Sequence, residues 1–469
     1  METNYERLSF LDNTFLVMEG PTNPMHVGAT LVFEAGESLR GKDGGIDIDV
    51  VRAFVGARLQ YVSRYRQRLQ WIPIERHPVW VDDAHFDLAY HVRHVALPRP
   101  GTMDQMREMS GRFLSQRLDR ARPMWEVLVI EGLEDGRFAL VAKVHHCMVD
   151  GIGGVDLLKV LLAPMPTTDI GEPDEYGPRP VPTAADLLID EAVRFLQLPP
   201  EAAKSMRGRD SKEIGELLRH RLRAMAASAR SGWFVNAAET PLNRKIGPNR
   251  RIAHLATDLD RAKAIKNGLG GTVNDVVIAT VAGAIRSFLI EEYDFEVEGV
   301  DFRAMVPVSV RDEAGVGDLG NQITMWLLDL PIAEPDPVKR YQAVASATRH
   351  LKETDQALGA AMLTQTASFT PSAALTVAAR VAAATARPFN LTITNVPGPQ
   401  VPLYMLESRL ERIFPMVPLW VNHGLGVALF SYDGRLNWGF AADWDTVPDL
   451  DEFVVRVERS LDELFSAAT

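Results

Sequence analysis

The sequence contains a single cysteine, Cys147, among its 469 residues. An intramolecular disulfide is therefore impossible, and a cysteine-rich metal site is excluded. Basic residues are fewer than acidic ones. The chain has 50 lysines and arginines and 62 aspartates and glutamates, so its formal net charge is −12. Proteins that bind nucleic acid present a basic face, so this charge balance argues against nucleic acid as a partner.

Long apolar runs are also missing, and no secretory leader is expected. No stretch of about 18 uncharged apolar residues occurs, and the nearest approach, residues 371–387, is interrupted by Arg380, so no membrane-spanning helix is expected. The first residues, METNYERLSF, lack the basic segment and apolar run of a secretory signal. The sequence therefore predicts a cytoplasmic protein.

The length of the chain indicates two folded units. Single cores stop growing near roughly 250–300 residues, and the ordinary globular composition of this chain suffices for two cores. A proline-rich, acidic stretch begins near residue 166, and basic helical sequence follows it. We therefore expect one lobe over residues 1–165, a crossover over 166–245 and a second lobe over 246–469.

Helices and strands alternate in the first half. A strand is expected over residues 28–34, and apolar positions at helical spacing predict a helix over 49–70 that Asp49 would cap. A second helix should cover residues 102–120. Two alternating strands then flank the turn at 134–136, which is typical of a hairpin.

The second half shows the same mixture. Residues 272–290 have a strongly apolar helical pattern, and a helix with basic residues is expected over 335–353. A strand covers residues 390–396, and Asp433-Gly434 joins the last two strands, which is a strong hairpin signal. Mixed helices and strands with many hairpins predict an α/β or α+β fold in which each lobe is built on a sheet.

The most informative segment is HHCMVDG, residues 145–151. Successive side chains of a strand face opposite ways, so only one of His145 and His146 can point at a given reacting centre. Asp150 lies four residues after His146, which is roughly 13 Å in an extended strand. A hydrogen bond between them would require the chain to turn at the glycines that follow.

Structural explanations of this segment remain open beside a catalytic one. A histidine at the end of an apolar strand is commonly a core residue, and an aspartate before a glycine is commonly a turn residue. His145, His146 and Asp150 could together bind a metal, but no further ligand is evident nearby. No metal site is therefore predicted.

The neighbouring sequence resembles one enzyme family. Residues 122–154 are similar to the wax ester synthase/diacylglycerol acyltransferase family, which belongs to a superfamily of coenzyme A-dependent acyltransferases with an HHxxxDG motif. The likeness covers most of the chain, and Met124 stands where the family has leucine in its PLW segment. Further family-like segments occur in the expected order: NPMHVG at 23–28, TPLNRKIGPNRR at 240–251, TVNDVV at 272–277, MVPVSVR at 305–311, GNQ at 320–322 and TNVPGP at 394–399.

This resemblance implies two chloramphenicol-acetyltransferase-like lobes, each a mixed sheet flanked by helices, with an active-site tunnel between them. It implies that His146 is the catalytic histidine with His145 as its support, and that Asp150 has a role more structural than chemical. Asn274 would complete the catalytic set. Four further residues are expected to bind substrate: Gly151, Asp275, Thr394 and Asn395.

These residue types suit acyl transfer to a hydroxyl, which is a poor nucleophile at neutral pH. A neutral imidazole, with an unperturbed pKa of about 6.5, can take the hydroxyl proton and return it to the leaving thiolate. Asn274 could donate to the oxyanion, or it could instead cap the helix that begins near it. Cys147 would face away from His146 on a strand, so direct transfer without an acyl-enzyme is expected.

No phosphate loop or dinucleotide glycine fingerprint occurs, and coenzyme A would be a substrate rather than a bound cofactor. Three arginines, Arg244, Arg250 and Arg251, could meet its phosphates, or they could form a solvated basic turn.

The sequence thus predicts an enzyme that moves a fatty acyl group from acyl-CoA to diacylglycerol or a long-chain alcohol. Such acceptors imply peripheral contact with a membrane or lipid droplet, for which residues 371–387 are a candidate. Two alternatives remain open. One is acyl transfer to another hydroxyl, as in polyketide-associated or peptide-condensation relatives, and the other is a lipid-binding protein that keeps the fold without turnover.

Overall fold

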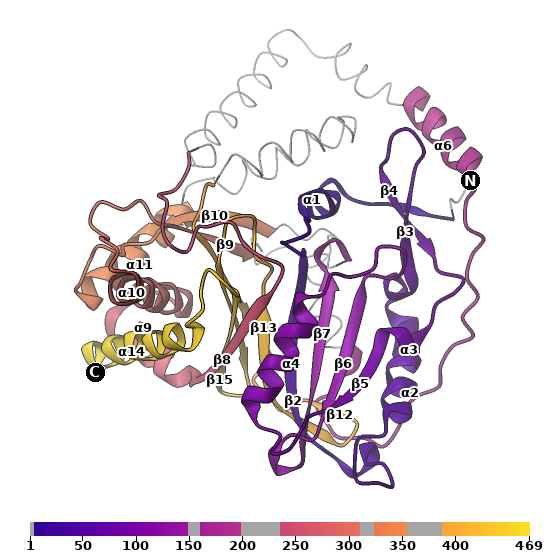
Figure 1. Ribbon diagram of the computed structural model, residues 1–469, viewed down its shortest axis with the longest axis horizontal. Coiled ribbons are helices and arrows are strands. Elements are labelled where there is room, and N and C mark those ends of the chain that lie inside the picture. Colours follow the sequence, from indigo (N-terminus) through magenta and orange to yellow (C-terminus); the bar gives the residue numbers. More distant parts are fainter. Residues whose placement is uncertain (1–3, 149–159, 198–234, 310–322, 354–386) are drawn as a thin grey trace.

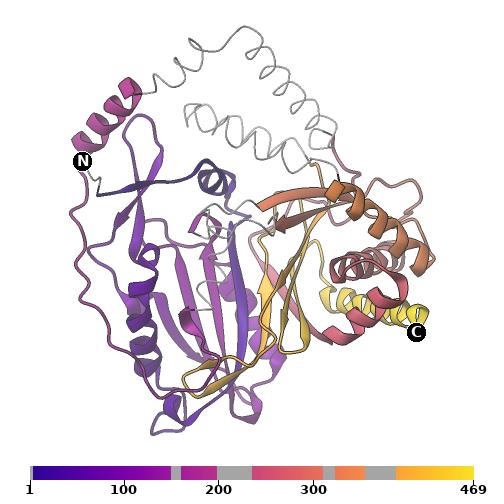
Figure 2. The same cartoon turned by 180° about the vertical axis from the view of Figure 1, so that it is seen from behind.

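The computed structural model describes residues 4–148, 160–197, 235–309, 323–353 and 387–469. Two six-stranded sheets, each flanked by helices, form two lobes that lie side by side (Figure 1, Figure 2). This mixed architecture confirms the predicted fold class.

The first lobe is built on a sheet with the strand order β12-β13-β2-β7-β6-β5. Neighbouring strands are antiparallel, except that β5 and β6 are parallel. Strand alternation gives the sheet two apolar faces, one packed on helix α2 and the other on α4. The main elements of this lobe are α1 Phe10–Met18, β2 His26–Glu34, α2 Ile48–Arg58, α3 Leu88–His91, β5 Val92–Ala96, α4 Met103–Ser115, β6 Trp125–Glu131 and β7 Arg137–His145.

A three-stranded sheet with the order β1-β4-β3 extends this lobe, and helix α6 packs on it. The β3–β4 hairpin projects beside α6 in both ribbon views (Figure 1, Figure 2). The elements are β1 Glu6–Arg7, β3 Gln67–Trp71, β4 Pro78–Asp82 and α6 Ala184–Gln197.

The second lobe is built on a sheet with the strand order β10-β9-β11-β14-β15-β8. Four helices, α9, α10, α11 and α14, cover one face of this sheet (Figure 1). The opposite face contributes side chains to the apolar clusters of the first lobe. The elements are β8 Arg250–Asp258, α9 Leu259–Leu269, α10 Val273–Tyr293, β9 Arg303–Ser309, β10 Ile323–Asp329, α11 Pro337–Glu353, β11 Leu391–Pro397, β14 Leu425–Tyr432, β15 Arg435–Asp443 and α14 Leu450–Ala468.

Helix α10 forms the centre of the second core. It is apolar on nearly every side, and 13 of its residues are buried, as expected of a helix enclosed by others. By length and composition α10 could cross a membrane, but 72% of the apolar window is buried inside the lobe. The same pattern is found in core helices of folded domains.

Two strands from the second half of the chain join the first sheet. β12 Tyr404–Met405 pairs with β13 Ser408–Met416, and β13 pairs antiparallel with β2. The chain then returns to the second sheet at β14. The sequence-based division does not include this exchange, because it assigns all of residues 246–469 to the second lobe.

The helix expected over residues 49–70 is shorter in the structure. α2 ends at Arg58, two 3-10 turns follow, and the remaining residues form β3. The helix is capped by Asp47, whose carboxylate accepts hydrogen bonds from the N–H groups of Asp49 and Val50. The apolar residues beyond Arg58 pack into the core from turns and a strand, which a helical spacing alone could not distinguish from a longer helix.

The hairpin predicted at Asp433-Gly434 is confirmed. Asp433 has φ 44° and Gly434 has φ 75°, and two central residues with positive φ are what a tight turn between twisted strands requires. Strands β14 and β15 pair in register on either side of this turn.

Candidate active site

His146 lies where the chain leaves the first sheet. Strand β7 ends at His145, and a single 3-10 turn follows. Two backbone hydrogen bonds fix this transition: the N–H of His145 donates to the Met124 carbonyl (2.9 Å), and the N–H of His146 donates to the Met25 carbonyl (2.8 Å). The strand alternation expected for His146 and Cys147 is therefore wrong, because both residues belong to the turn.

The imidazole of His146 stacks on the ring of Phe15 from helix α1, with centroids 3.8 Å apart and planes 15° from parallel. Burial lowers the pKa of His146 to about 4, and its own backbone carbonyl acts in the opposite direction. Nδ1 is enclosed, and no other group in the described part of the chain bonds to it. A proton on Nδ1, directed at that carbonyl, would leave the lone pair of Nε2 free to act as a base.

His145 is buried and takes part in a charged network beneath the turn. Its Nδ1 accepts a hydrogen bond from the Cys147 N–H at 3.2 Å, so the neutral ring carries its proton on Nε2. Nε2 lies 3.7 Å from the Glu19 carboxylate, which also binds Arg117 (3.1 Å) and Arg120 (2.6 Å). Burial, with the nearby Arg120 and His146, holds the pKa of His145 well below its usual value. This arrangement suits the supporting role predicted for His145.

The geometry does not favour Cys147 as a nucleophile. Its side chain is buried, and burial raises the pKa of the thiol well above its usual value. Among the described residues, no three histidine, cysteine or carboxylate side chains converge as a metal site. Asp150 and Gly151 lie outside the described residues, so their predicted roles and the predicted tunnel stay predictions.

An apolar wall adjoins the stacked ring of Phe15 from the side of the second lobe. Trp420, between β13 and β14, has its ring centroid 6.3 Å from that of Phe15, and Phe389 meets Trp420 edge to face at 6.0 Å. Both pack with Met305 and Leu327 of the second sheet. Sequence reasoning missed these residues because no motif contains them and they meet only when the lobes come together.

Asn274 and Asp275 lie in the first turn of α10. The helix is capped by Thr272, whose N–H and hydroxyl donate to the Asp275 carboxylate at 2.7 and 2.8 Å, while Thr272 accepts from the Asp275 N–H. Thr348 of α11 donates to the other carboxylate oxygen at 2.6 Å. The alternative that Asn274 caps the helix is therefore wrong, and its half-buried side chain is not part of the cap. The carboxylate of Asp275 thus has structural partners in the cap and in α11. Its substrate-binding role stays a prediction.

Thr394 and Asn395 lie on strand β11 and face opposite ways. Leu391 and Ile393 pack under the helices of the second lobe, whereas Val396 packs against the core of the first lobe. By alternation Thr394 shares the face of Val396, and Asn395 shares the face of Ile393. Only Thr394 is therefore on the side of the histidine turn.

The three arginines considered for coenzyme A phosphates have different environments. Arg250 is buried, donates to two backbone carbonyls of its own loop at 2.8 and 2.9 Å, and lies 3.6 Å from Asp443. It is a structural residue and does not belong to a solvated turn. Arg251 lies over the Trp444 ring at 3.8 Å, and Arg244 is exposed.

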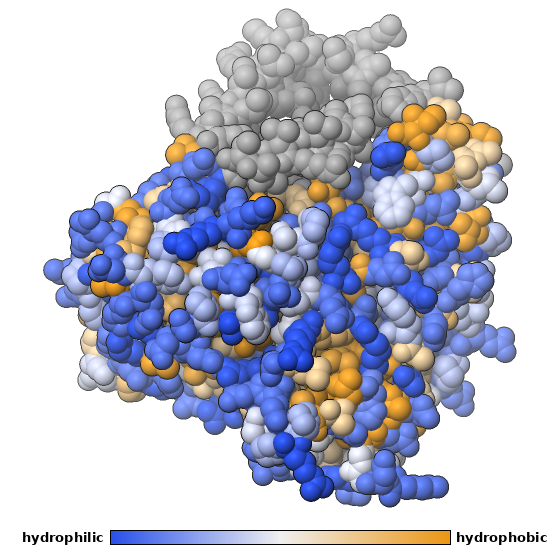
Figure 3. Space-filling model, in the orientation of Figure 1, coloured by the Kyte–Doolittle hydropathy of each residue, from blue (hydrophilic) through white to orange (hydrophobic). Residues whose placement is uncertain are grey.

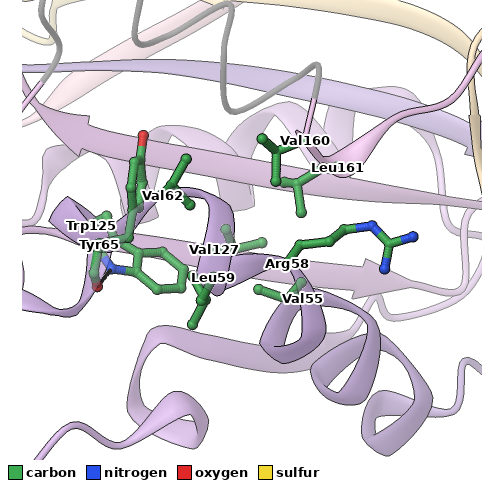
Figure 4. Close-up of a pocket in the computed structure, with 9 residues that line it drawn as sticks. All are labelled: Val55, Arg58, Leu59, Val62, Tyr65, Trp125, Val127, Val160 and Leu161. Atoms are coloured by element: carbon green, nitrogen blue, oxygen red, sulfur yellow. Dashed lines mark hydrogen bonds between the residues drawn. The ribbon is translucent and has the colours of Figure 1, made fainter. Parts of the chain in front are cut away.

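A small apolar pocket lies on the face of the first sheet that α2 covers (Figure 4). Its cavity volume is only about 10 Å³, which is room for roughly one water molecule, so in this structure it does not accommodate an acyl chain or a nucleotide. The Arg58 guanidinium donates to backbone carbonyls and points away from the other lining side chains. The pocket is lined by Val55, Arg58, Leu59, Val62, Tyr65, Trp125, Val127, Val160 and Leu161.

The architecture belongs to a known structural class. The starter condensation domain of rhizomide synthetase, at 12% identity, matches with a TM-score of 0.57 over 99% of this chain and 94% of that chain, which shows the fold alone. Two such sheet-based lobes with a histidine turn at the end of the central strand define the two-lobed, chloramphenicol-acetyltransferase-like fold.

Closer relatives identify the family. The wax ester synthase/diacylglycerol acyltransferase from Marinobacter aquaeolei VT8 is 28% identical, with a TM-score of 0.69 over 98% of this chain and 99% of that chain. A candidate diacylglycerol O-acyltransferase of Mycobacterium tuberculosis H37Rv is 34% identical over 475 residues, covering 97% of this chain and 99% of the relative. The catalytic domain of the wax ester synthase/diacylglycerol acyltransferase family matches residues 8–277, and its C-terminal domain matches residues 319–465. The chain belongs to this family, as the sequence motifs predicted.

Proposed function

We propose that this protein is an O-acyltransferase that moves a fatty acyl group from acyl-CoA to diacylglycerol or a long-chain alcohol. The observation that supports this most directly is the half-buried imidazole of His146, which lies at the end of the central strand and stacks on Phe15. The names of the Marinobacter and Mycobacterium relatives point to the same reaction class.

In the proposed step, the acceptor hydroxyl attacks the thioester carbonyl carbon while Nε2 of His146 takes the hydroxyl proton. The new C–O bond produces a tetrahedral oxyanion, for which Asn274 is the proposed donor. Collapse of this intermediate breaks the C–S bond, and the imidazolium returns the proton to the departing thiolate. The products are an ester and free coenzyme A thiol, so atoms and charge balance.

The surroundings of His146 support this chemistry. Because burial lowers its pKa to about 4, the ring is neutral at physiological pH. The side chains of Phe15, Trp420 and Phe389 provide an apolar surface next to the base. Such a surface suits a fatty chain and excludes water that would hydrolyse the thioester.

Acyl-CoA is proposed as a consumed substrate and not as a resident cofactor. The proposed location is cytoplasmic, at the surface of a membrane or lipid droplet, because both acceptors dissolve in lipid. A short-chain or polar hydroxyl acceptor, and a lipid-binding role without turnover, are the alternatives that the first experiment separates.

The test measures coenzyme A thiol released from palmitoyl-CoA, with diacylglycerol and a long-chain alcohol offered separately. His146→Ala is expected to lower acceptor-dependent release by about 10²-fold or more. Cys147→Ala serves as the control at the next residue, and it should keep its activity because the thiol takes no part.

Unchanged release by a folded His146→Ala protein would show that His146 is not the base. If the wild-type protein releases no thiol with either lipid acceptor, another hydroxyl or a binding role replaces the proposed reaction.

A further inference from the structure

Helix α6 exposes three aliphatic side chains and turns two of its three acids, Asp190 and Glu191, inward. A surface helix normally buries its apolar stripe and exposes its charges. In α6 the buried face contains Leu187 and Glu191, with Asp190 beside them. The opposite face presents three exposed aliphatic side chains: Leu188, Ile189 and Val193.

Specific contacts fix this orientation. The hydroxyl of Tyr5 donates to Asp190 at 3.1 Å, and Arg7 donates to Glu191 at 2.5 Å. Leu187 packs into the apolar cluster beneath the three-stranded sheet. These contacts set the rotation of the helix about its axis, so its aliphatic face is held toward solvent.

The tip of the β3–β4 hairpin lies beside α6 (Figure 1) and also exposes apolar groups. Ile74 is 88% exposed and has φ 68°, a left-handed conformation that a β-branched residue rarely adopts. Trp71 and Arg76 are exposed on either side of it. Arg76 forms no ion pair within the part of the chain that the structure describes.

The exposed residues of these two neighbouring elements are named the α6–hairpin surface, which consists of Trp71, Ile74, Arg76, Leu188, Ile189 and Val193. Figure 3 shows apolar side chains gathered at the upper right, where α6 and the hairpin lie in Figure 1. Arg76 supplies a positive charge to this surface, while Asp190 and Glu191 are engaged on the inner side. The remaining acid of α6, Asp186, is exposed in the first turn, where its carboxylate accepts hydrogen bonds from the N–H and hydroxyl of Thr183. Aliphatic groups with a tryptophan and an arginine at the rim are the composition that a lipid interface with anionic headgroups favours.

We propose that the α6–hairpin surface docks this protein on a lipid surface. The proposal rests on the proposed function, because diacylglycerol and long-chain alcohols reside in lipid and must be reached there. The aliphatic side chains enter the boundary between headgroups and acyl chains, and Arg76 meets the anionic headgroups.

The experiment measures sedimentation of the full-length protein with vesicles made of phosphatidylcholine and phosphatidylglycerol in equal parts. Ile189→Glu introduces a charge into the docking face, and Ile74→Asn replaces the tip with a polar residue that tolerates positive φ. Val455→Glu is the matched control, because Val455 of α14 is 57% exposed and Ile189 is 61% exposed. We expect both test variants to lower the vesicle partition coefficient about tenfold or more, and the control to bind like wild type.

Two activity assays keep this proposal separate from the enzymatic one. Turnover of diacylglycerol in vesicles should fall with binding, while turnover of a short water-soluble alcohol should stay at the wild-type rate. A wild-type protein that binds vesicles through this surface but releases no thiol would contradict the proposed function and support the docking surface.

Wild-type vesicle binding by both test variants would overturn the docking proposal. If these normally binding variants also have a lower unfolding temperature or an altered size on gel filtration, the face has a different occupant. In that case the face would be covered by another segment of this chain or by a second copy.

Discussion

At the scale of single residues, two adjacent histidines have different tasks because the strand ends between them. His145 still belongs to β7 and reaches Glu19, whereas His146 begins the turn and stacks on Phe15. Both rings are neutral, because burial opposes the charged form of each. Their order in the sequence alone does not assign these roles.

The lowered pKa of His146 predicts an unusual pH profile. The neutral ring is the base and exists above its pKa, so kcat/KM should fall as the pH drops through about 4 rather than 6.5. Thiol release measured from neutral pH downward, with circular dichroism to confirm folding, checks this expectation.

Phe15→Ala tests the cause of this shift. Removal of the stacked ring admits water to His146, so the midpoint of the kcat/KM pH profile should move upward toward 6.5. A wild-type midpoint already near 6.5 would contradict the enclosed environment of the base.

At the scale of elements, the first turn of α10 combines a cap with a candidate catalytic side chain. Thr272 and Asp275 satisfy backbone N–H groups, and Thr348 connects the cap to α11. Asn274 lies between the capping partners without belonging to the cap. Neighbouring positions can therefore be tested separately for stability and for catalysis.

Thr272→Ala should lower the free energy of unfolding by about 1 kcal/mol. Asp275→Ala should cost about 2–3 kcal/mol, because it also leaves Thr348 without its partner. Neither variant should change KM for acyl-CoA, whereas Asn274→Ala should lower kcat by about 10²-fold with little change in stability. Urea unfolding and steady-state kinetics provide these quantities. A raised KM in folded Asp275→Ala would instead support its substrate-binding role.

At the scale of the whole molecule, the two lobes are joined by the exchange of β13 and by a close approach of their sheets. β13 extends the first sheet, and its Pro415 carbonyl lies against Gly439 of β15 in the second sheet. A Cβ at Gly439 would overlap that carbonyl oxygen. The glycine thus permits the backbone contact by which the lobes are positioned on either side of the histidine turn.

Gly439→Ala should therefore lower the free energy of unfolding by about 3 kcal/mol, because a backbone carbonyl cannot move aside without displacing its strand. Gly177→Ala is the control, since no atom lies within 4 Å of its added Cβ. Urea unfolding compares the two variants. If Gly439→Ala were as stable as Gly177→Ala, the two lobes could move apart at this contact with little loss of unfolding free energy.

Local features of the fold and the candidate base follow from the sequence alone. Asp433-Gly434 predicts its hairpin because these residues accept positive φ, and α10 is evident because its apolar residues recur around a complete helix. The HHxxxDG segment and the ordered family motifs predict the family and indicate His146 as the base.

Only the tertiary structure decided where α2 ends, which sheet β13 joins and which side chains surround His146. It also showed the outward aliphatic face of α6, whose direction depends on hydrogen bonds to Tyr5 and Arg7. The physical reason is the same in each case. Periodicity and turn chemistry act over a few neighbouring residues, whereas these arrangements depend on contacts between residues far apart in the chain.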